Sequence, residues 1–203
     1  MGRVIVGIDE VGRGPLAGPV VAAAVILPEE QPWFSGIKDS KKISAKKREA
    51  LYDLITQNSV YAIRDVSPEI IDEMNILYAS LYAMKLALES VCAQNKWDGK
   101  PLPEVALIDG NHTIPCGDGW LDLDIEQVPI VNGDNLNKYI GAASIIAKVY
   151  RDRLMTAEHE KYPEYGFNKH AGYGTKQHFE AIQKYGPCPI HRKTFSGVRQ
   201  YLK

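Results

Sequence analysis

The sequence predicts a single α/β domain with a mixed central sheet flanked by helices. Two observations lead to this fold class. Short apolar runs rich in β-branched residues alternate along the chain with longer segments in which apolar residues recur every three or four positions. A chain of 203 residues with 45% hydrophobic residues is also long enough to bury one full core. We therefore treat residues 1–203 as one domain.

Strands are expected where apolar residues run together. Val4 to Val6 is predicted to be a buried strand that opens into the glycine-rich stretch 7–18. An almost wholly apolar strand follows this stretch, and a later buried strand ends on Asp109. The complete set of expected strands is 4–6, 20–27, 60–66, 104–108 and 128–131.

Helices are expected where helical periodicity follows a capping residue. Ser44 and Thr175 are suitable N-caps, and Ser67 is followed by a proline and an acid, which is a helix-start signal. Leu77, Leu81 and the apolar residues after them form a broad stripe on one long helix. The expected helices are 45–57, one starting at 68, 76–94, 136–157 and 175–185, with loops over 28–36, 112–127 and 162–175.

The cysteines and the N-terminus favour a cytoplasmic protein. Cys92, Cys116 and Cys188 are odd in number and have no paired spacing, which indicates reduced thiols rather than a disulfide framework. The N-terminus does not have the pattern of a signal peptide, and no apolar run is expected to reach membrane length. We expect a cytoplasmic monomer that does not act at a membrane.

The net charge of −1 does not identify a partner, but the charges are unevenly distributed. Basic residues gather at 38–48, where Asp39 is the single acid, and at 169–203, where Glu180 is the single acid. Such segregation allows a basic face for phosphates and a separate acidic pocket. The alternative is that these lysines only solvate helix faces, and for either cluster alone that alternative is favoured.

Four carboxylates stand at or just beyond expected strand ends: Asp9, Glu10, Asp109 and Asp134. Strand ends of an open α/β sheet gather at one crevice, where ligands bind. Oxygen ligands without a His or Cys partner indicate a hard cation, Mg²⁺ or Mn²⁺, and such clusters hold two ions about 3.5–4 Å apart for in-line displacement at phosphorus. The alternative for the first pair is that Asp9 is a turn cap and Glu10 a solvated charge.

The motifs around these carboxylates resemble those of bacterial ribonuclease HII, the type 2 ribonuclease H family. The resemblance covers nearly the whole chain, and its motifs occur in order. They comprise residues 7–19, Lys38-Asp39-Ser40-Lys41-Lys42, Asp109-Gly110-Asn111, Gly133-Asp134 with 142–149, residues 162–167 with 172–175, and His191-Arg192-Lys193-Thr194-Phe195.

The resemblance implies a ribonuclease H-like fold with a small C-terminal helical part, from about residue 160 to residue 203. It implies divalent-metal-dependent endonucleolytic cleavage of the RNA strand of RNA/DNA hybrids. It also implies incision at single ribonucleotides embedded in duplex DNA, with 3′-hydroxyl and 5′-phosphate products. The implied cofactor is Mg²⁺ or Mn²⁺, and the implied partners are the hybrid and the ribonucleotide-containing duplex.

The resemblance also assigns roles to individual residues. The four carboxylates, Asp9, Glu10, Asp109 and Asp134, are the implied catalytic metal ligands. The backbone of Gly12-Arg13-Gly14 is implied to read the 2′-hydroxyl, which distinguishes RNA from DNA locally. Tyr173 is implied to pack on the sugar of the following deoxynucleotide. The implied phosphate contacts are Ser40, Lys41 and Lys42.

The chain departs from the family pattern at three places. Asn132 and Ala171 stand where the family usually has lysine, and the loop 112–127 lies in a connection that is longer than usual. The two changes remove positive charge near the expected substrate path. We therefore expect weaker phosphate binding than is usual in the family, with unchanged chemistry.

Two alternative functions are open to the sequence. Gly12-x-Gly14-x-x-Ala17 satisfies a dinucleotide-binding pattern, but a strand rather than a helix follows it, and Asp9 and Glu10 would repel a pyrophosphate. A nucleic-acid-binding module with an inert acidic pocket would explain the basic clusters and leave the carboxylates without a role. Metal-dependent nicking of a duplex with one ribonucleotide distinguishes these functions.

A zinc site is the remaining possibility. It would use His170, His178, Cys188 and His191, but their spacings fit neither a zinc finger nor a zinc ribbon. We do not predict zinc binding. Cys116 is expected to be a loop thiol rather than a nucleophile, because the sequence offers no base beside it.

Overall fold

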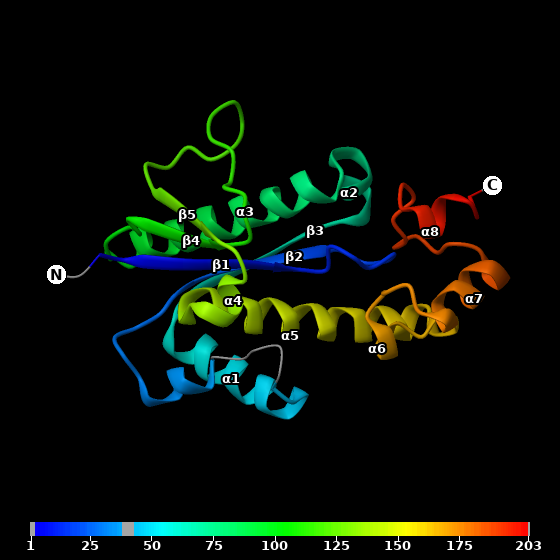
Figure 1. The fold of residues 1–203 in the computed structure, drawn as a ribbon, viewed down its shortest axis with the longest axis horizontal. Helices are drawn as coiled ribbons and strands as arrows, with labels where there is room; N and C mark the ends of the chain where they lie inside the picture. Colours follow the sequence, from blue (N-terminus) through cyan, green and yellow to red (C-terminus); the bar gives the residue numbers. More distant parts are fainter. Residues whose placement is uncertain (1–2, 38–42, 203) are drawn as a thin grey trace.

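A five-stranded mixed sheet lies at the centre of the protein (Figure 1). The computed structural model describes residues 3–37 and 43–202. The strand order is β3-β2-β1-β4-β5, in which β1, β2 and β3 are antiparallel neighbours and β1, β4 and β5 are parallel. The strands are β1 (Ile5–Val11), β2 (Val20–Ile26), β3 (Val60–Val66), β4 (Val105–Asp109) and β5 (Glu126–Ile130).

Helices cover both faces of this sheet, as the α/β prediction requires. In Figure 1, α3 lies on one side of the sheet, and α1 and α5 lie on the other. The helices are α1 (Ala45–Asn58), α2 (Pro68–Met74), α3 (Ile76–Trp97), α4 (Gly133–Leu136), α5 (Lys138–Lys161), α6 (Phe167–His170), α7 (Lys176–Tyr185) and α8 (Ser196–Arg199), with 3₁₀ turns η1 (Pro32–Gly36) and η2 (Pro163–Tyr165). The single turns η1, η2, α6 and α8 were not expected, because they are too short to show periodicity.

The first strand is longer than the sequence predicts. We expected it to end at Val6, but β1 continues through Asp9 and Glu10 to Val11. In the register with β2, Asp9 lies opposite Ala23 and Glu10 opposite Ala22. Pairing with β4 ends at Ile8, but pairing with β2 continues through Val11 and outweighs the weak strand preference of acidic residues. The two carboxylates are therefore held by a rigid strand rather than by a turn.

Alternate residues of β2 supply two separate cores. Ala22 and Ala24 belong to the core under α3, whereas Val21 and Ala23 belong to the core under α1 and α5. These side chains are fully buried. A strand covered on both faces is expected to be apolar throughout, which explains why this segment lacks polar alternation.

The long helix α3 is apolar enough to cross a membrane. Its segment Ile76–Lys96 satisfies a membrane span by length and composition, so the expectation that no run reaches this length was wrong. Half of that segment is buried inside the protein, where Ala83, Ala87 and Leu88 pack into the core against the sheet. Its apolar character is therefore explained by packing.

The helix expected over 136–157 is α5, which begins at Lys138, and the separate short helix α4 precedes it. Asn137 adopts an extended conformation, ends α4, and caps α5 with its Oδ1, which accepts a bond of 2.9 Å from the amide of Tyr139. Asn132 precedes α4 in the left-handed region at φ 56°. This break places Asp134 in the first turn of α4, close to the end of β4.

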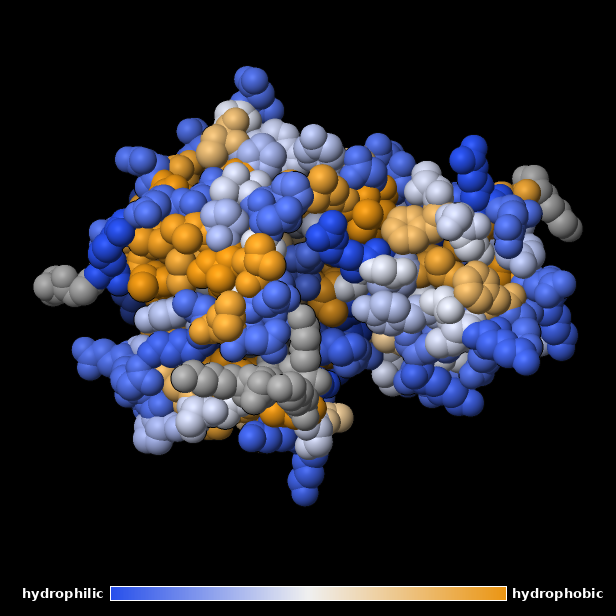
Figure 2. All heavy atoms as spheres, viewed as in Figure 1, coloured by the Kyte–Doolittle hydropathy of each residue, from blue (hydrophilic) through white to orange (hydrophobic). Residues whose placement is uncertain are grey.

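The C-terminal helices form a third core with the end of α5. Met155 of α5 packs with Phe167, Ile182 and Val198 in this cluster, which also includes Leu16 of the glycine-rich stretch. On the face shown in Figure 2, hydrophilic side chains predominate where the sheet meets these helices, and apolar side chains gather over the strands farther away. The glycine-rich stretch thus joins the sheet to the C-terminal part.

Candidate active site

Asp9 and Glu10 are adjacent carboxylates on the central strand, of which Asp9 is buried and Glu10 is partly buried. Asp9 is 5% exposed, and its Oδ1 accepts a bond of 2.7 Å from the amide of Glu10. Alternate residues of a strand face the same side, so Asp9 shares the face of Gly7, which packs against α5. A Cβ on Gly7 would lie 2.1 Å from the carbonyl carbon of Tyr139. Because α5 crosses so closely, its Ser144 lies beside Asp9 in the same cavity and opposes the rise of the Asp9 pKa.

Asp109 and Asp134 reach the same corner from two other elements. The parallel register of β1 and β4 pairs Ile8 with Ile108, so Asp109 follows beside Asp9. The amide of Asp134 donates to Oδ1 of Asp109 at 3.3 Å. A Cβ on Gly133 would lie 3.3 Å from that same oxygen. The absence of a side chain at this glycine therefore lets α4 approach the end of β4.

A cavity of about 390 Å³ opens over this corner. Asp9, Glu10 and Asp109 line it, whereas Asp134, which is 1% exposed, lies behind Asp109. The described lining residues are completed by Val11, Gly12, Arg13, Gly14, Arg48, Ser144, Ile145, Lys148 and Tyr173. The lining therefore combines carboxylates, cations, backbone and one aromatic ring.

Burial and mutual repulsion both disfavour charge on the two β1 carboxylates. The pKa of Asp9 is raised well above its ordinary value, first by burial and then by the charges of Glu10 and Asp109. Burial is also the main cause that raises the pKa of Glu10, and the Arg13 guanidinium opposes this rise. A cation bound between these groups would relieve the repulsion.

The donor set fits a hard divalent cation. Oε1 of Glu10 accepts from Arg13 at 3.3 Å, whereas its buried Oε2 has no hydrogen-bond partner in the described part of the chain. Among residues 3–37 and 43–202, no three Asp, Glu, His or Cys side chains form a ready-made ligand set. An ion held here would thus complete its shell with waters and substrate oxygens, as Mg²⁺ usually does.

The Gly12–Gly14 segment and Tyr173 form one wall of the cavity. A Cβ on Gly14 would lie 3.4 Å from the Tyr173 ring, so the ring lies against this glycine. The amide of Leu16 donates to the carbonyl of Gly172 at 2.8 Å and joins the two segments. Tyr173 is 44% exposed, so its ring is available to a ligand in the cavity.

Comparison with known proteins places the chain in a family. The family model for Ribonuclease HII matches residues 6–198. The chain belongs to the ribonuclease HII family. Ribonuclease HII from Burkholderia cenocepacia (strain HI2424) is 50% identical over 201 residues, which are 98% of this chain and 86% of that protein.

A more distant relative and a solved structure agree with this family assignment. Ribonuclease HII from Paraburkholderia xenovorans (strain LB400) is 46% identical over 198 residues, which are 97% of this chain and 74% of that protein. The crystal structure of the ribonuclease H2 from Pyrococcus horikoshii OT3 is similar with a TM-score of 0.75 and 28% identity, over 97% of this chain and 96% of that one. The expected ribonuclease H-like fold is confirmed, and the protein is an endoribonuclease that hydrolyses the RNA strand of RNA/DNA hybrids.

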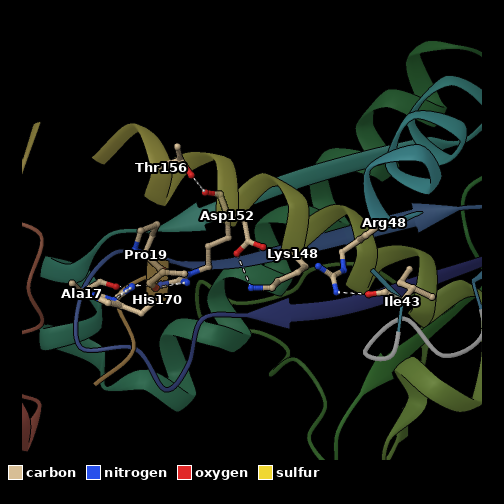
Figure 3. Close-up of polar contacts among 11 residues, drawn as sticks. Ala17, Pro19, Ile43, Arg48, Lys148, Asp152, Thr156 and His170 are labelled. Carbon is tan, nitrogen blue, oxygen red and sulfur yellow. Dashed lines mark hydrogen bonds and ion pairs between the residues drawn. The ribbon is translucent and has the colours of Figure 1, made fainter. Parts of the chain in front are cut away.

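Three residues that line the cavity were not expected at the site. Ser144 and Lys148 lie four residues apart on one face of α5, a helical spacing that could have indicated a polar stripe. Arg48 donates to the carbonyl of Ile43 at 3.2 Å, and Lys148 bonds Asp152 at 2.6 Å (Figure 3). Both cations thus stand beside the carboxylates. The predicted phosphate contacts Ser40, Lys41 and Lys42 lie outside the described residues.

The His and Cys residues near the C-terminus form a hydrogen-bonded chain. The amide of Cys188 donates to Nδ1 of His191 at 2.9 Å, so Nε2 of His191 carries the proton and donates to Nε2 of His178 at 3.0 Å. Nδ1 of His178 then donates to the carbonyl of Tyr173 at 3.0 Å. All four imidazole nitrogens have partners. This network explains the two buried histidines without zinc.

The same pair predicts acid sensitivity of the fold. Burial is the main cause that lowers the pKa of His178 and of His191 to about 4. Between pH 6.5 and 4 the unfolded chain binds more protons, so stability falls as pH falls, by about 2 kcal/mol per imidazole at pH 5. We expect His191→Gln to flatten the dependence of Tm on pH between 7.5 and 5, and the exposed His112→Gln to leave it unchanged. An equal slope in all three proteins would contradict this assignment.

Proposed function

We propose that the protein incises duplex DNA at single embedded ribonucleotides as well as cleaving longer hybrids, and leaves 3′-hydroxyl and 5′-phosphate ends. The observation that carries this proposal is the corner at which Asp9, Glu10 and Asp109 line one cavity beside Gly12–Gly14. Within this one cavity, the carboxylates would supply the hydrolytic chemistry and the Gly12–Gly14 backbone would recognise the ribonucleotide.

In this proposal Asp9, Glu10, Asp109 and Asp134 hold Mg²⁺ or Mn²⁺. Bound divalent ions activate a water and stabilise the leaving oxygen at phosphorus. Asp9 and Glu10 would contribute ligands from a rigid strand, which fixes their positions. Asp134 would lie behind Asp109 and orient it, since the amide of Asp134 donates a hydrogen bond to the Asp109 carboxylate. Lys148 and Arg48 would face the charge of the phosphodiester.

Recognition of the ribonucleotide is assigned to the Gly12–Gly14 backbone and Tyr173. The 2′-hydroxyl both donates and accepts, so backbone amides can read it. The Tyr173 ring lies against Gly14 and is half-exposed, which suits packing on the next sugar. Phosphate binding by Ser40, Lys41 and Lys42 remains part of the proposal. So does action as a monomer in the cytoplasm, where the free thiols of Cys92, Cys116 and Cys188 would stay reduced.

Product mapping on a duplex with one ribonucleotide tests the proposal. With Mg²⁺ or Mn²⁺, we expect a single nick beside the ribonucleotide, and loss of the nick when any of the four carboxylates is changed to its amide. An all-DNA duplex of the same sequence is the control. Binding without cleavage in either metal would favour the nucleic-acid-binding module instead.

Metal binding should also be visible without substrate. An ion that binds only the folded chain, at ten times its Kd, adds about 1.4 kcal/mol and raises Tm by about 3–5 °C. We expect this rise in millimolar MgCl₂ and a smaller one in NaCl of equal ionic strength. Equal shifts in the two salts would mean that screening, rather than a site, explains the effect.

Lysines at the two atypical positions should strengthen phosphate binding. Asn132 and Ala171 both have positive φ, at 56° and 49°. A lysine at 171 keeps the strain that alanine already bears, whereas a lysine at 132 adds some, because asparagine tolerates this region better. We expect the double change Asn132→Lys and Ala171→Lys to raise duplex affinity roughly fivefold at low salt. The gain should vanish in 0.5 M NaCl. An unchanged Kd at low salt would show that these positions lie off the substrate path.

A further inference from the structure

Arg192 is a fully buried cation whose partners are backbone carbonyls. Its Nη2 donates to the carbonyl of Gly12 at 2.5 Å, its Nη1 to that of Arg13 at 2.9 Å, and its Nε to that of Gly18 at 2.9 Å. Within the described residues, no carboxylate lies at ion-pair distance from this guanidinium. All three nitrogens of the guanidinium, through three of its five N–H groups, therefore hold the glycine-rich segment.

Such an arrangement costs stability, so it calls for an explanation. Burying a charge without an opposite charge is unfavourable, and burial lowers the pKa of Arg192 to about 9. Arg151 lies beside it with its pKa lowered to about 10 by burial, and its guanidinium donates to the carbonyls of Ala17, Pro19 and Ala171. Ala17 and Pro19 are labelled in Figure 3. Two buried cations thus lie under one loop.

The peptide geometry shows what Arg192 does to the loop. In a trans peptide the carbonyl of one residue and the amide of the next point in opposite directions. The inward carbonyls of Gly12 and Arg13 therefore turn the amides of Arg13 and Gly14 away from Arg192. Gly12, Arg13 and Gly14 line the cavity on the other side. Successive amides directed outward form a concave donor site of the kind that binds oxygen atoms.

Gly12 shows how tightly the loop lies on these cations. Its φ is +94°, and a Cβ there would lie 2.3 Å from Nε of Arg151. A side chain at this position would push the loop off the buried guanidiniums. The conformation of the loop is therefore coupled to Arg151 and Arg192 rather than set by the local sequence alone.

We propose that Arg192 is the positioning residue that directs the amides of Arg13 and Gly14 at the ribonucleotide, and so sets the preference for RNA over DNA at the incised nucleotide. This inference rests on the proposed reading of the 2′-hydroxyl by Gly12–Gly14. Arg192 does not touch the substrate in this proposal. It acts through the two carbonyls that it holds.

The test compares binding rather than turnover. In an Asp109→Asn background, Kd is measured for a duplex with one ribonucleotide and for the all-DNA duplex of the same sequence. Arg192→Lys keeps the charge but cannot hold three carbonyls at once. We expect the ratio of the two Kd values to fall at least tenfold, while Kd for all-DNA duplex changes less than twofold. Arg199→Lys, an exposed arginine of α8, should leave both constants unchanged.

Two results separate failure of the inference from failure of the proposed function. If the protein that retains Arg192 shows no preference for the ribonucleotide duplex over all-DNA duplex, the proposed function of Gly12–Gly14 fails. If the preference exists and Arg192→Lys retains it, the role of Arg192 is refuted.

A second measurement needs no change at Arg192 and covers the case in which its variant does not fold. The ¹⁵N-amide resonances of Arg13 and Gly14 should shift with the ribonucleotide duplex and not with the all-DNA duplex. Equal shifts with the two duplexes would mean that these amides do not read the ribonucleotide, which overturns the proposed function of Gly12–Gly14 and, with it, the inference about Arg192.

Discussion

Changing Asp109 to asparagine should reduce cleavage of a one-ribonucleotide duplex at least about 1,000-fold, which corresponds to about 4 kcal/mol of transition-state stabilisation. Asparagine retains an Oδ1 that can accept from the amide of Asp134, so the corner keeps its shape. What is lost is one negative charge beside Asp9 and Glu10. Single-turnover rates in Mg²⁺, together with Kd for the same duplex, separate lost chemistry from lost binding.

The same change should stabilise the protein when no divalent ion is present. Asp109 repels Asp9 and Glu10 and contributes to the raised pKa of both groups. Removing its charge should raise Tm in EDTA by about 1–3 °C. Asp122→Asn, on an exposed residue of the long loop, is the matched control and should change neither rate nor Tm. Near-normal turnover of the Asp109 variant would remove this carboxylate from the proposed site.

The largest loss of stability is expected from Gly7→Ala. The new methyl group would overlap the backbone of α5, because its Cβ would lie 2.1 Å from the carbonyl carbon and 2.3 Å from the carbonyl oxygen of Tyr139. Backbone cannot swing aside as a side chain can, so α5 must move away from β1. We expect a cost of about 3–5 kcal/mol and a fall in Tm of about 10 °C or more.

Gly99→Ala is the matched control for this change. Gly99 has a positive φ of 69°, and a Cβ there would meet nothing within 4 Å. It should cost only about 1 kcal/mol, from backbone strain. Thermal unfolding of the two variants decides the matter. If both variants lose equal stability, close crossing of the helix does not explain the need for glycine at residue 7.

The sequence predicted the layers of the fold better than the limits of its elements. Apolar periodicity located α1, α3, β2 and β3 to within a few residues, because these segments repeat a strong pattern. It missed the extension of β1 through Asp9 and Glu10, since pairing with β2 is a tertiary effect. It also missed the short helix α4, which ends just before Asn137, the residue whose side chain caps α5.

The corner of the site followed from the positions of carboxylates after apolar runs, but its supporting residues did not. Arg151 occupies a buried position of α5 between Ala147 and Met155, four residues from each. An arginine within an apolar stripe was the available signal for its role. Arg192 has no such periodic context, and only the folded chain shows that it lies beneath Gly12.

Arg192, which fixes the orientation of the Gly12–Gly14 backbone, is synthesised late in the chain. The five strands, the four carboxylates of the site and helix α5 all precede residue 162. Gly12 and Arg13 nevertheless receive their fixed orientation from the side chain of Arg192. A nascent chain on the ribosome therefore contains the four carboxylates of the site before it contains the residue that gives a preference for a ribonucleotide. The preference for a ribonucleotide over a deoxyribonucleotide is therefore established last, when the C-terminal helices dock. A chain truncated before residue 190 should keep the carboxylates together but lose this preference.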